Sequence, residues 1–309
     1  MKFTRFSCKK IYNRLRFYWI RQFCDAKSLA DYLYFKKFHR KINWEHPEDL
    51  NQWINWLAFN TDTTEWSRLA DKYAVRAYIA EQGYEDILVP LLAVWDAPEK
   101  IDLSGLPMQF VLKMNNGCGD VIIVKDKSTA SLTEIRKHFA KLFAHPFGRN
   151  SAEPHYMRIK PLIIAEALLD ISKQAVKATS LVDYKLYIIN GIPRYCYAAK
   201  NRYRLEHAEI DLYRLPNWEH CPHLLCYNNH YCKSDGVIMR PKTLDKMMEI
   251  ASKLAGNHPI VRIDFYEVDD LVYFGELTFT SFAGRCSIFS DELQKELGGM
   301  VHIGINNRL

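Results

Sequence analysis

The chain has 309 residues, of which 48% are hydrophobic and 13% aromatic, and its formal net charge is +6. This is an ordinary globular composition, long enough for one large multi-lobed unit or for two domains with sizeable cores. No run approaches the roughly 20 apolar residues that a membrane span requires, and the N-terminus lacks the apolar region of a signal peptide. We therefore expect a cytoplasmic protein whose eight cysteines are free thiols.

Positive charge is concentrated at the N-terminus. Residues 1–41 contain twelve Lys and Arg against two Asp, a net charge of +10, so the remainder carries −4. Aromatic and aliphatic residues interleave with these cations, which predicts a basic amphipathic helical segment set apart from residues 42–309. The segment fits peripheral contact with the anionic inner face of a membrane, or it packs its aromatic face on the body. Nucleic acid is the competing partner, and we disfavour it because the positive charge stops at Lys41.

The pattern is helical to about residue 83, with a helix expected to begin at Pro47. A strand, a glycine loop and a second strand follow, at residues 110–113, 115–119 and 121–124. Glycines let backbone N–H groups approach an anion, and Lys113 adds a positive charge, so this segment is a candidate phosphate-binding loop. An ordinary hairpin turn is the alternative, since the spacing of a Walker motif is missing.

Further along, residues 131–143 read as a helix, and strands are expected at 162–168, 183–189 and 193–199, the last two joined by the turn Asn190-Gly191. An irregular, tyrosine-rich insert is expected to about residue 240, before a helix at 243–255. This insert holds enough candidate ligands for a structural zinc ion, although no C-x-x-C pair is present: His220, Cys221, His223, Cys226, His230 and Cys232. A substrate-side loop is the alternative.

Two apolar strand-like runs near the C-terminus, at residues 261–266 and 273–278, carry charged residues where a core strand has Val. Side chains two apart share a face, so Arg262 lies beside Asp264, and Glu276 beside Thr278. We expect Asp264 to face Glu276 only if the connecting loop has three or five residues. Facing carboxylates of this kind suit Mg²⁺ with a bound polyphosphate. The alternative is a surface hairpin with solvated charges.

Along the whole chain, helices and strands are expected in separate runs, which predicts an α+β fold.

Five ordered blocks resemble a known family: "LADKYAVRAYI", "FVLKMNNGCGDVIIVKDK", "IIAEALLD", "DYKLYIINGIPRY" and "VRIDFYEVDDLVYFGELTFTSFAG". Over residues 35 to 300 the chain is similar to the ATP-grasp superfamily, and most closely to its TupA-like branch of teichuronopeptide biosynthesis. The resemblance implies an ATP-grasp domain at 42–309, in which two α+β lobes clamp ATP and the helical N-terminal region is shortened.

The resemblance also implies a role for each matching residue. Lys72 and Lys113 are expected on the α- and β-phosphates and Lys185 on the γ-phosphate, with Arg262 stabilising the transferring phosphoryl group. The metal-binding residues are expected to be Asp264, Glu276 and Thr278, the last standing where many members have Asn. The adenine is expected against residues 162–169, with Glu166 reading its edge and Asp170 a candidate ribose contact. The remaining nucleotide-binding residues are expected to be Asn115, Gly117, Cys118, Gly119, Ala165 and Leu168.

The activity implied is that of an ATP-dependent carboxylate–amine ligase that works through an acyl phosphate, with ATP and Mg²⁺ as cofactors. The family's association with cell-surface and capsule polysaccharides implies a uronic-acid-type carboxylate and an amino acid or similar amine as substrates. One alternative is a phosphotransferase or glycosyltransferase that modifies glycans. Another is a non-catalytic nucleotide-binding scaffold on the membrane surface.

Overall fold

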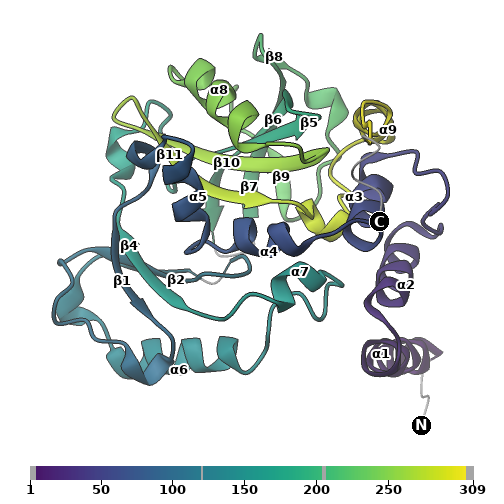
Figure 1. Ribbon diagram of the computed structural model, residues 1–309, viewed down its shortest axis with the longest axis horizontal. Coiled ribbons are helices and arrows are strands. Elements are labelled where there is room, and N and C mark those ends of the chain that lie inside the picture. The colour runs from purple at the N-terminus through teal and green to yellow at the C-terminus, as the bar shows by residue number, and fades with distance from the viewer. Residues whose placement is uncertain (1–4, 120, 204–206, 304–309) are drawn as a thin grey trace.

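The computed structural model describes residues 5–119, 121–203 and 207–303, and it contains two β-sheets with helices packed around them (Figure 1). The four-stranded sheet has the order β1-β4-β2-β3. The larger sheet has the order β11-β10-β5-β6-β7-β8, and β9 pairs with β7. Helices and mostly antiparallel strands in separate runs form the predicted α+β architecture.

The four-stranded sheet and its helix form a small lobe with a core of its own. In β2 the residues Phe110, Leu112 and Met114 are buried, so Val111 and Lys113 point to the opposite face. The buried face packs against α6, which starts where the Ser131 hydroxyl accepts a hydrogen bond from the Glu134 N–H at 3.3 Å. The elements of this lobe are β1 (Leu91–Trp95), β2 (Phe110–Met114), β3 (Val121–Val124), α6 (Leu132–Phe143) and β4 (Ile163–Ala167).

The larger sheet forms the second lobe, and its central strands β5 and β10 are buried along most of their length. One face is covered by α8, whose apolar stripe includes Leu244, Met247, Ile250 and Leu254 (Figure 1). The elements are β5 (Asp183–Ile189), β6 (Ile192–Tyr203), β7 (His207–Arg214), β8 (Glu219–His220), β9 (Tyr231–Lys233), α8 (Leu244–Leu254), β10 (Ile260–Val268), β11 (Leu271–Thr278) and α9 (Asp291–Gly299). The expectation of an irregular insert to residue 240 was therefore wrong, since part of it extends this sheet as β7, β8 and β9.

The β10–β11 hairpin corrects the expected loop length. Its turn has two residues, Asp269 and Asp270, both with positive φ, rather than three or five. Asp264 nevertheless faces Glu276, because the register shifts by one residue between Asp264 and Phe265 and leaves Gly275 as the extra residue of a β-bulge. A Cβ on Gly275 would lie 3.0 Å from the Asp264 carbonyl oxygen, so the bulge favours glycine.

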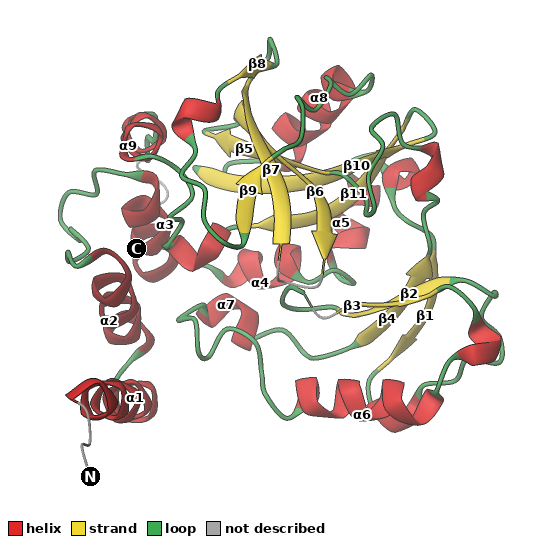
Figure 2. Cartoon of the chain, turned by 180° about the vertical axis from the view of Figure 1, so that it is seen from behind, coloured by secondary structure: helices red, strands yellow, loops and turns green. Residues whose placement is uncertain are grey.

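The remaining helices precede or link the two lobes: α1 (Arg5–Phe23), α2 (Ala26–Phe38), α3 (Leu50–Asn60), α4 (Thr64–Ala70), α5 (Val75–Glu81) and α7 (Pro154–Met157). The third helix begins at Leu50 rather than at Pro47, because the Asp49 carboxylate caps it by accepting a hydrogen bond from the Gln52 N–H at 2.8 Å. In two opposite views α1 and α2 stand beside the sheets, with α1 far from α8 (Figures 1 and 2). None of the described helices combines the length and apolar character needed to cross a membrane.

Candidate functional site

The two facing carboxylates of the hairpin are held by one arginine. The Arg262 Nε lies 2.6 Å from Asp264 Oδ1 and its Nη2 lies 2.9 Å from Asp264 Oδ2. The same Nη2 donates to Glu276 at 2.8 Å and to the Thr278 hydroxyl at 3.1 Å, and that hydroxyl donates to Glu276. All four residues were predicted site residues, and the structure brings them together. The alternative of solvated hairpin charges is wrong for this cluster, since Arg262 and Asp264 are buried.

Lys185 joins this cluster from β5, the strand on the other side of β10. It is paired with Asp264 in the sheet, and its ammonium group contacts the Asp264 carboxylate directly. It also lies 3.5 Å from Asp183, which in turn forms an ion pair with Arg202. Asp183 and Arg202 were not among the predicted site residues.

Lys72 connects the glycine loop of the small lobe to the carboxylates of the large lobe. It lies in the turn between α4 and α5, where the Asp71 carboxylate accepts hydrogen bonds from two backbone N–H groups of that turn. The Lys72 ammonium donates to the Gly117 carbonyl at 2.6 Å and lies 3.2 Å from Glu276. Three predicted site residues from separate parts of the sequence therefore meet at one point.

The glycine loop has the backbone conformation that its sequence suggested. Gly117 and Gly119 have φ values of +83° and +82°, in the region that favours glycine. A Cβ on Gly117 would lie 2.9 Å from the Phe147 ring, so this position has no room for a side chain. Between them, Cys118 reaches the surface, but desolvation of its thiol by the surrounding protein and the charge of Glu276 raise its pKa above the ordinary value. The raised pKa argues against a reactive thiolate.

Lys113 and Glu166 are diagonal neighbours on the adjacent strands β2 and β4 of the small lobe. The Lys113 ammonium lies 2.6 Å from one Glu166 oxygen, and Arg76 of α5 lies 3.7 Å from the other. Sequence reasoning missed Arg76, although it follows Lys72 by four residues in the same block that resembles the family. These two ion pairs fix the position of the Glu166 carboxylate, which is the group expected to accept a hydrogen bond from the adenine amino group.

Other residues expected at the nucleotide have mainly structural contacts. The Asn115 side chain accepts from the Leu162 N–H at 2.8 Å and donates to the Lys160 carbonyl at 3.0 Å, so it positions the loop before β4. Ala165 lies between β1 and β2 with its side chain in the small-lobe core. Leu168 follows the end of β4 at Ala167, and the exposed Asp170 accepts hydrogen bonds from Ser172.

The electrostatics of the cluster favour an anion together with a cation. Six cationic side chains against four carboxylates leave a net charge of +2 among Lys72, Arg76, Lys113, Lys185, Arg202, Arg262, Glu166, Asp183, Asp264 and Glu276. Burial acts to raise the pKa of Glu276, but Lys72, Arg262 and Lys185 outweigh it and lower that pKa below its ordinary value. Glu276 is therefore ionised at neutral pH. Two facing oxygen donors of this kind fit Mg²⁺.

The segment after β11 extends the cluster with residues that sequence reasoning did not assign. The Ser281 hydroxyl lies 3.1 Å from Arg262 Nη1 and 2.6 Å from the Tyr187 hydroxyl. Phe282 and Ala283, the next two residues, have φ values of +52°. Such left-handed conformations in non-glycine residues are uncommon and are often found at ligand-binding sites.

The six His and Cys residues between 220 and 232 do not converge. His220 instead lies 3.0 Å from Asp211, Cys221 is buried, and Cys232 contacts His207 from outside the run. No group of three or more His, Cys, Asp or Glu arranged to hold a metal ion occurs in the part of the chain that the structure describes. The zinc alternative is therefore not supported by this arrangement.

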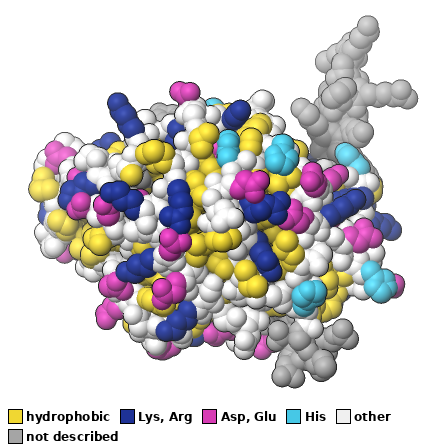
Figure 3. Space-filling view, turned by 90° about the horizontal axis from the view of Figure 1, so that it is seen from above, with side chains coloured by type: hydrophobic (Ala, Val, Ile, Leu, Met, Phe, Trp, Pro, Cys, Tyr) yellow, Lys and Arg dark blue, Asp and Glu magenta, His cyan; other side chains and the backbone are white. Residues whose placement is uncertain are grey.

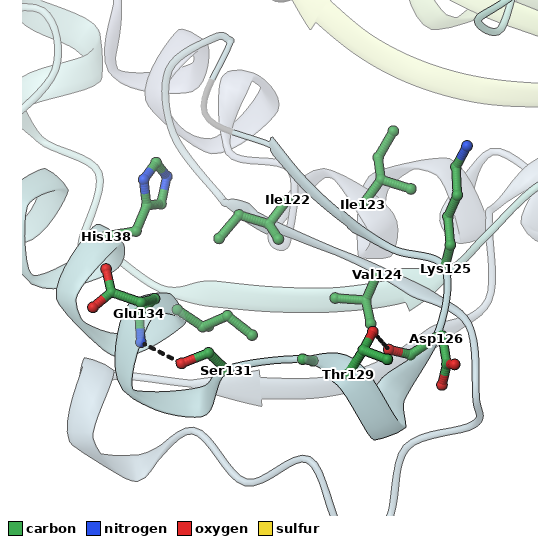
Figure 4. Close-up of a pocket in the computed structure, with 11 residues that line it drawn as sticks. Ile122, Ile123, Val124, Lys125, Asp126, Thr129, Ser131, Glu134 and His138 are labelled. Carbon is green, nitrogen blue, oxygen red and sulfur yellow. Dashed lines mark hydrogen bonds between the residues drawn. The ribbon is translucent and has the colours of Figure 1, made fainter.

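A hollow of about 400 Å³ lies outside the charged cluster, between β3 and the start of α6 (Figure 4). Ile122, Ile123 and Val124 line it from the strand, and Glu134 and His138 line it from the helix. None of the residues predicted to bind nucleotide or metal lines this hollow.

Comparison with known proteins gives one family match. The model of the family described as "TupA-like ATPgrasp" matches residues 52–302. A search of curated proteins finds no match.

Solved structures of ligases resemble the chain at low identity. The L-amino acid ligase from Bacillus licheniformis has a TM-score of 0.49 and 13% identity, over 85% of this chain and 57% of that one. The D-alanine–D-alanine ligase from Bacillus anthracis complexed with ATP has a TM-score of 0.40 and 13% identity, over 71% of this chain and 56% of that one. The ligase PsnB, complexed with minimal precursor, Mg and ADP, has a TM-score of 0.41 and 14% identity, over 81% of this chain and 66% of that one. The chain spans 56% to 65% of the first three structures matched.

Proposed function

Because the chain belongs to the TupA-like ATP-grasp family, we propose that it is an ATP-dependent ligase that activates a carboxylate and joins it to an amine. One observation carries this proposal. Lys72 contacts both the glycine loop and Glu276, so the candidate phosphate-binding loop and the candidate metal ligands belong to one site.

In the proposed site, Lys72, Lys113 and the N–H groups around Gly117 and Gly119 bind the phosphates. Glu166 and the backbone after β4, at Leu168, hold the adenine. Asp264 and Glu276 would hold Mg²⁺, with Thr278 beside them, and the ion would supply charge neutralisation for the phosphates.

The proposed reaction has two steps. A carboxylate oxygen of the substrate attacks the γ-phosphorus of ATP, and the bond to the β-phosphate oxygen breaks, which yields ADP and an acyl phosphate. An amine then attacks the acyl carbon, phosphate leaves, and the amine nitrogen loses a proton. Lys185 and Arg262 stabilise the negative charge spread over the phosphoryl oxygens during the first step.

We further propose a uronic-acid-type carboxylate and an amino acid or similar amine as substrates, in the biosynthesis of cell-surface polysaccharide. Support for this finer assignment is membership of the TupA-like branch, whose association with surface glycans led to the expectation. A cytoplasmic location follows from the same assignment, since ATP and activated sugars are supplied there.

The test is nucleotide release from Mg-ATP by the full chain with mixed uronic acids, with and without an amino-acid pool. We expect the amine to increase the release of ADP and phosphate. This release should be lost in Glu276→Gln and kept in Glu292→Gln, the same change at an exposed glutamate of α9. Carboxylate labelled with ¹⁸O would pass one label to the released phosphate. AMP and pyrophosphate would refute the acyl-phosphate route. Phosphorylated sugar without any need for an amine would indicate a phosphotransferase, and ATP binding without turnover of any sugar acid would indicate a scaffold.

A further inference from the structure

The described part of α1 has an exposed apolar stripe. Leu15, Trp19 and Phe23 are 63%, 59% and 72% exposed, and their spacing of four residues places them along one side of the helix. Tyr18, at 42% exposure, lies beside this stripe. Large apolar side chains grouped in this way on a soluble protein typically mark an interaction surface.

The opposite side of the same helix is already packed. Ile20 is buried against Leu29 and Ala30 of α2 and against Ala152, with Phe17 and Cys24 beside it. Arg21 Nη1 also donates to the Asn150 side chain at 3.0 Å. The helix is thereby fixed in rotation, with the Leu15, Trp19 and Phe23 stripe directed away from the body. The interpretation that this segment packs on the body therefore holds for one side of the helix, and membrane contact stays a prediction for the opposite side.

Arginines flank the stripe on both sides. With 100° between successive residues, Arg16 lies next to Phe23 on one flank, and Arg14 lies beyond Tyr18 on the other. Arg21 lies farther round the helix, on the side where it reaches Asn150. The carbon centres of the Arg14 and Arg21 guanidinium groups lie 5.8 Å and 4.9 Å from the Tyr18 ring centroid. This arrangement of an apolar face between cationic borders is typical of helices that lie in a membrane interface.

Few acidic residues lie near this surface. The sequence of α1 contains no Asp or Glu. Asp25 caps α2 by accepting a hydrogen bond from the Ser28 N–H, and Asp31 accepts one from the Trp44 indole at 3.0 Å. The next helix adds exposed Phe35 with exposed Lys36 and Lys37. Arg14, Arg16, Lys36 and Lys37 outnumber Asp25 and Asp31, so this surface is cationic as well as apolar.

The face of the protein seen from above in Figure 3 differs from this α1 surface, since acidic and basic side chains are interspersed on it.

A second copy of the chain is a poor occupant for the α1 stripe, because it would bring two arginine borders together. An anionic surface with an apolar interior complements both features. We propose that α1 docks the protein on an anionic lipid bilayer, with Leu15, Trp19 and Phe23 inserted among the acyl chains and Arg14 and Arg16 on the headgroups. This inference is independent of the proposed function.

The test is co-flotation of the full chain with vesicles of phosphatidylcholine alone or with about 30% phosphatidylglycerol, at about 0.1 M salt. We expect binding to the anionic vesicles at least about tenfold tighter than to the neutral ones, and weaker binding at higher salt. Trp19→Ser with Phe23→Ser should reduce it at least about tenfold. The matched control replaces two exposed apolar residues elsewhere, Val237→Ser with Met239→Ser, and should bind like the wild type.

A second variant tests the charge. Arg14→Glu with Arg16→Glu should lose the preference for anionic vesicles, whereas Lys137→Glu, on exposed α6 surface, should keep it. Circular dichroism and thermal unfolding would verify that each variant is folded. Absence of vesicle binding by the wild type, equal binding to both vesicle types, or undiminished binding of the Trp19 and Phe23 variant would overturn the proposal. Trp19-dependent dimerisation without lipid binding would overturn it in favour of a second copy.

Discussion

His155 gives the structure a specific sensitivity to acid. It lies on α7 with no exposed surface, its ring 5.6 Å from that of Trp66 on α4, which stacks on Phe279. Neither ring nitrogen has a hydrogen-bond partner among the described residues. Burial, with a smaller contribution from the charge of Arg158, lowers the pKa of His155 from 6.5 to about 3.

The size of the effect follows from proton linkage. The unfolded chain binds a proton at this histidine below pH 6.5, whereas the folded chain stays neutral until about pH 3. Stability from this group is therefore fully present above pH 6.5 and is lost as the pH falls toward 3. Between pH 8 and pH 5 the two pKa values give a loss of about 2 kcal/mol in the free energy of unfolding.

The assay compares urea unfolding of the wild type and His155→Phe at pH 8 and pH 5, followed by tryptophan fluorescence. Phe keeps an aromatic ring beside Trp66 and gives up no hydrogen bond, so the variant should fold. We expect its loss of stability between the two pH values to be smaller than that of the wild type by about 2 kcal/mol. His46→Phe, at an exposed position, should leave the wild-type difference unchanged. Equal losses in the wild type and His155→Phe would refute the reasoning.

Three further predictions concern the site and its support. Gly284→Ala should lower the free energy of unfolding in urea by about 2–4 kcal/mol, because φ of Gly284 is +63° and the new Cβ would lie 2.2 Å from the Asn55 amide nitrogen. An unchanged urea midpoint would contradict this. Arg262→Lys should lower kcat at least about tenfold with little change in ATP affinity, since lysine cannot form the fork to both carboxylates; a larger effect on the Kd would argue against a transition-state role. Lys113→Ala should weaken Mg-ATP binding about 10- to 100-fold by calorimetry, whereas Lys137→Ala should not, and equal affinities would remove Lys113 from the phosphate site.

Much of the site could be predicted because its residue types conflict with their local pattern. Arg262, Asp264 and Glu276 are charged residues in apolar strands, and the period of two in a strand already placed Arg262 beside Asp264. The same period made the loop prediction wrong, because it holds only for a regular ladder and the bulge at Gly275 adds one residue. A bulge is set by packing against the facing strand, which the local sequence does not contain.

Other features depend on partners that the local residue pattern does not reveal. The strand β7 pairs with β6 in a sheet whose neighbours were not evident from the tyrosine-rich segment itself. Arg76 and Arg202 read as ordinary surface cations until the fold places them beside Glu166 and Asp183. Their function as partners of buried carboxylates is a property of the tertiary structure.

The charges in the site also explain how the fold tolerates two facing carboxylates. Asp264 and Glu276 would repel each other or share a proton if they stood alone. Arg262 contacts both, Lys185 contacts Asp264 and Lys72 contacts Glu276, so these cations offset the repulsion between the two carboxylates. These cations are the groups that we propose bind phosphate, and an arriving polyphosphate would compete with the carboxylates for them. A divalent cation would then replace the lost positive charge at Asp264 and Glu276, so nucleotide and metal should bind more tightly together than either does alone.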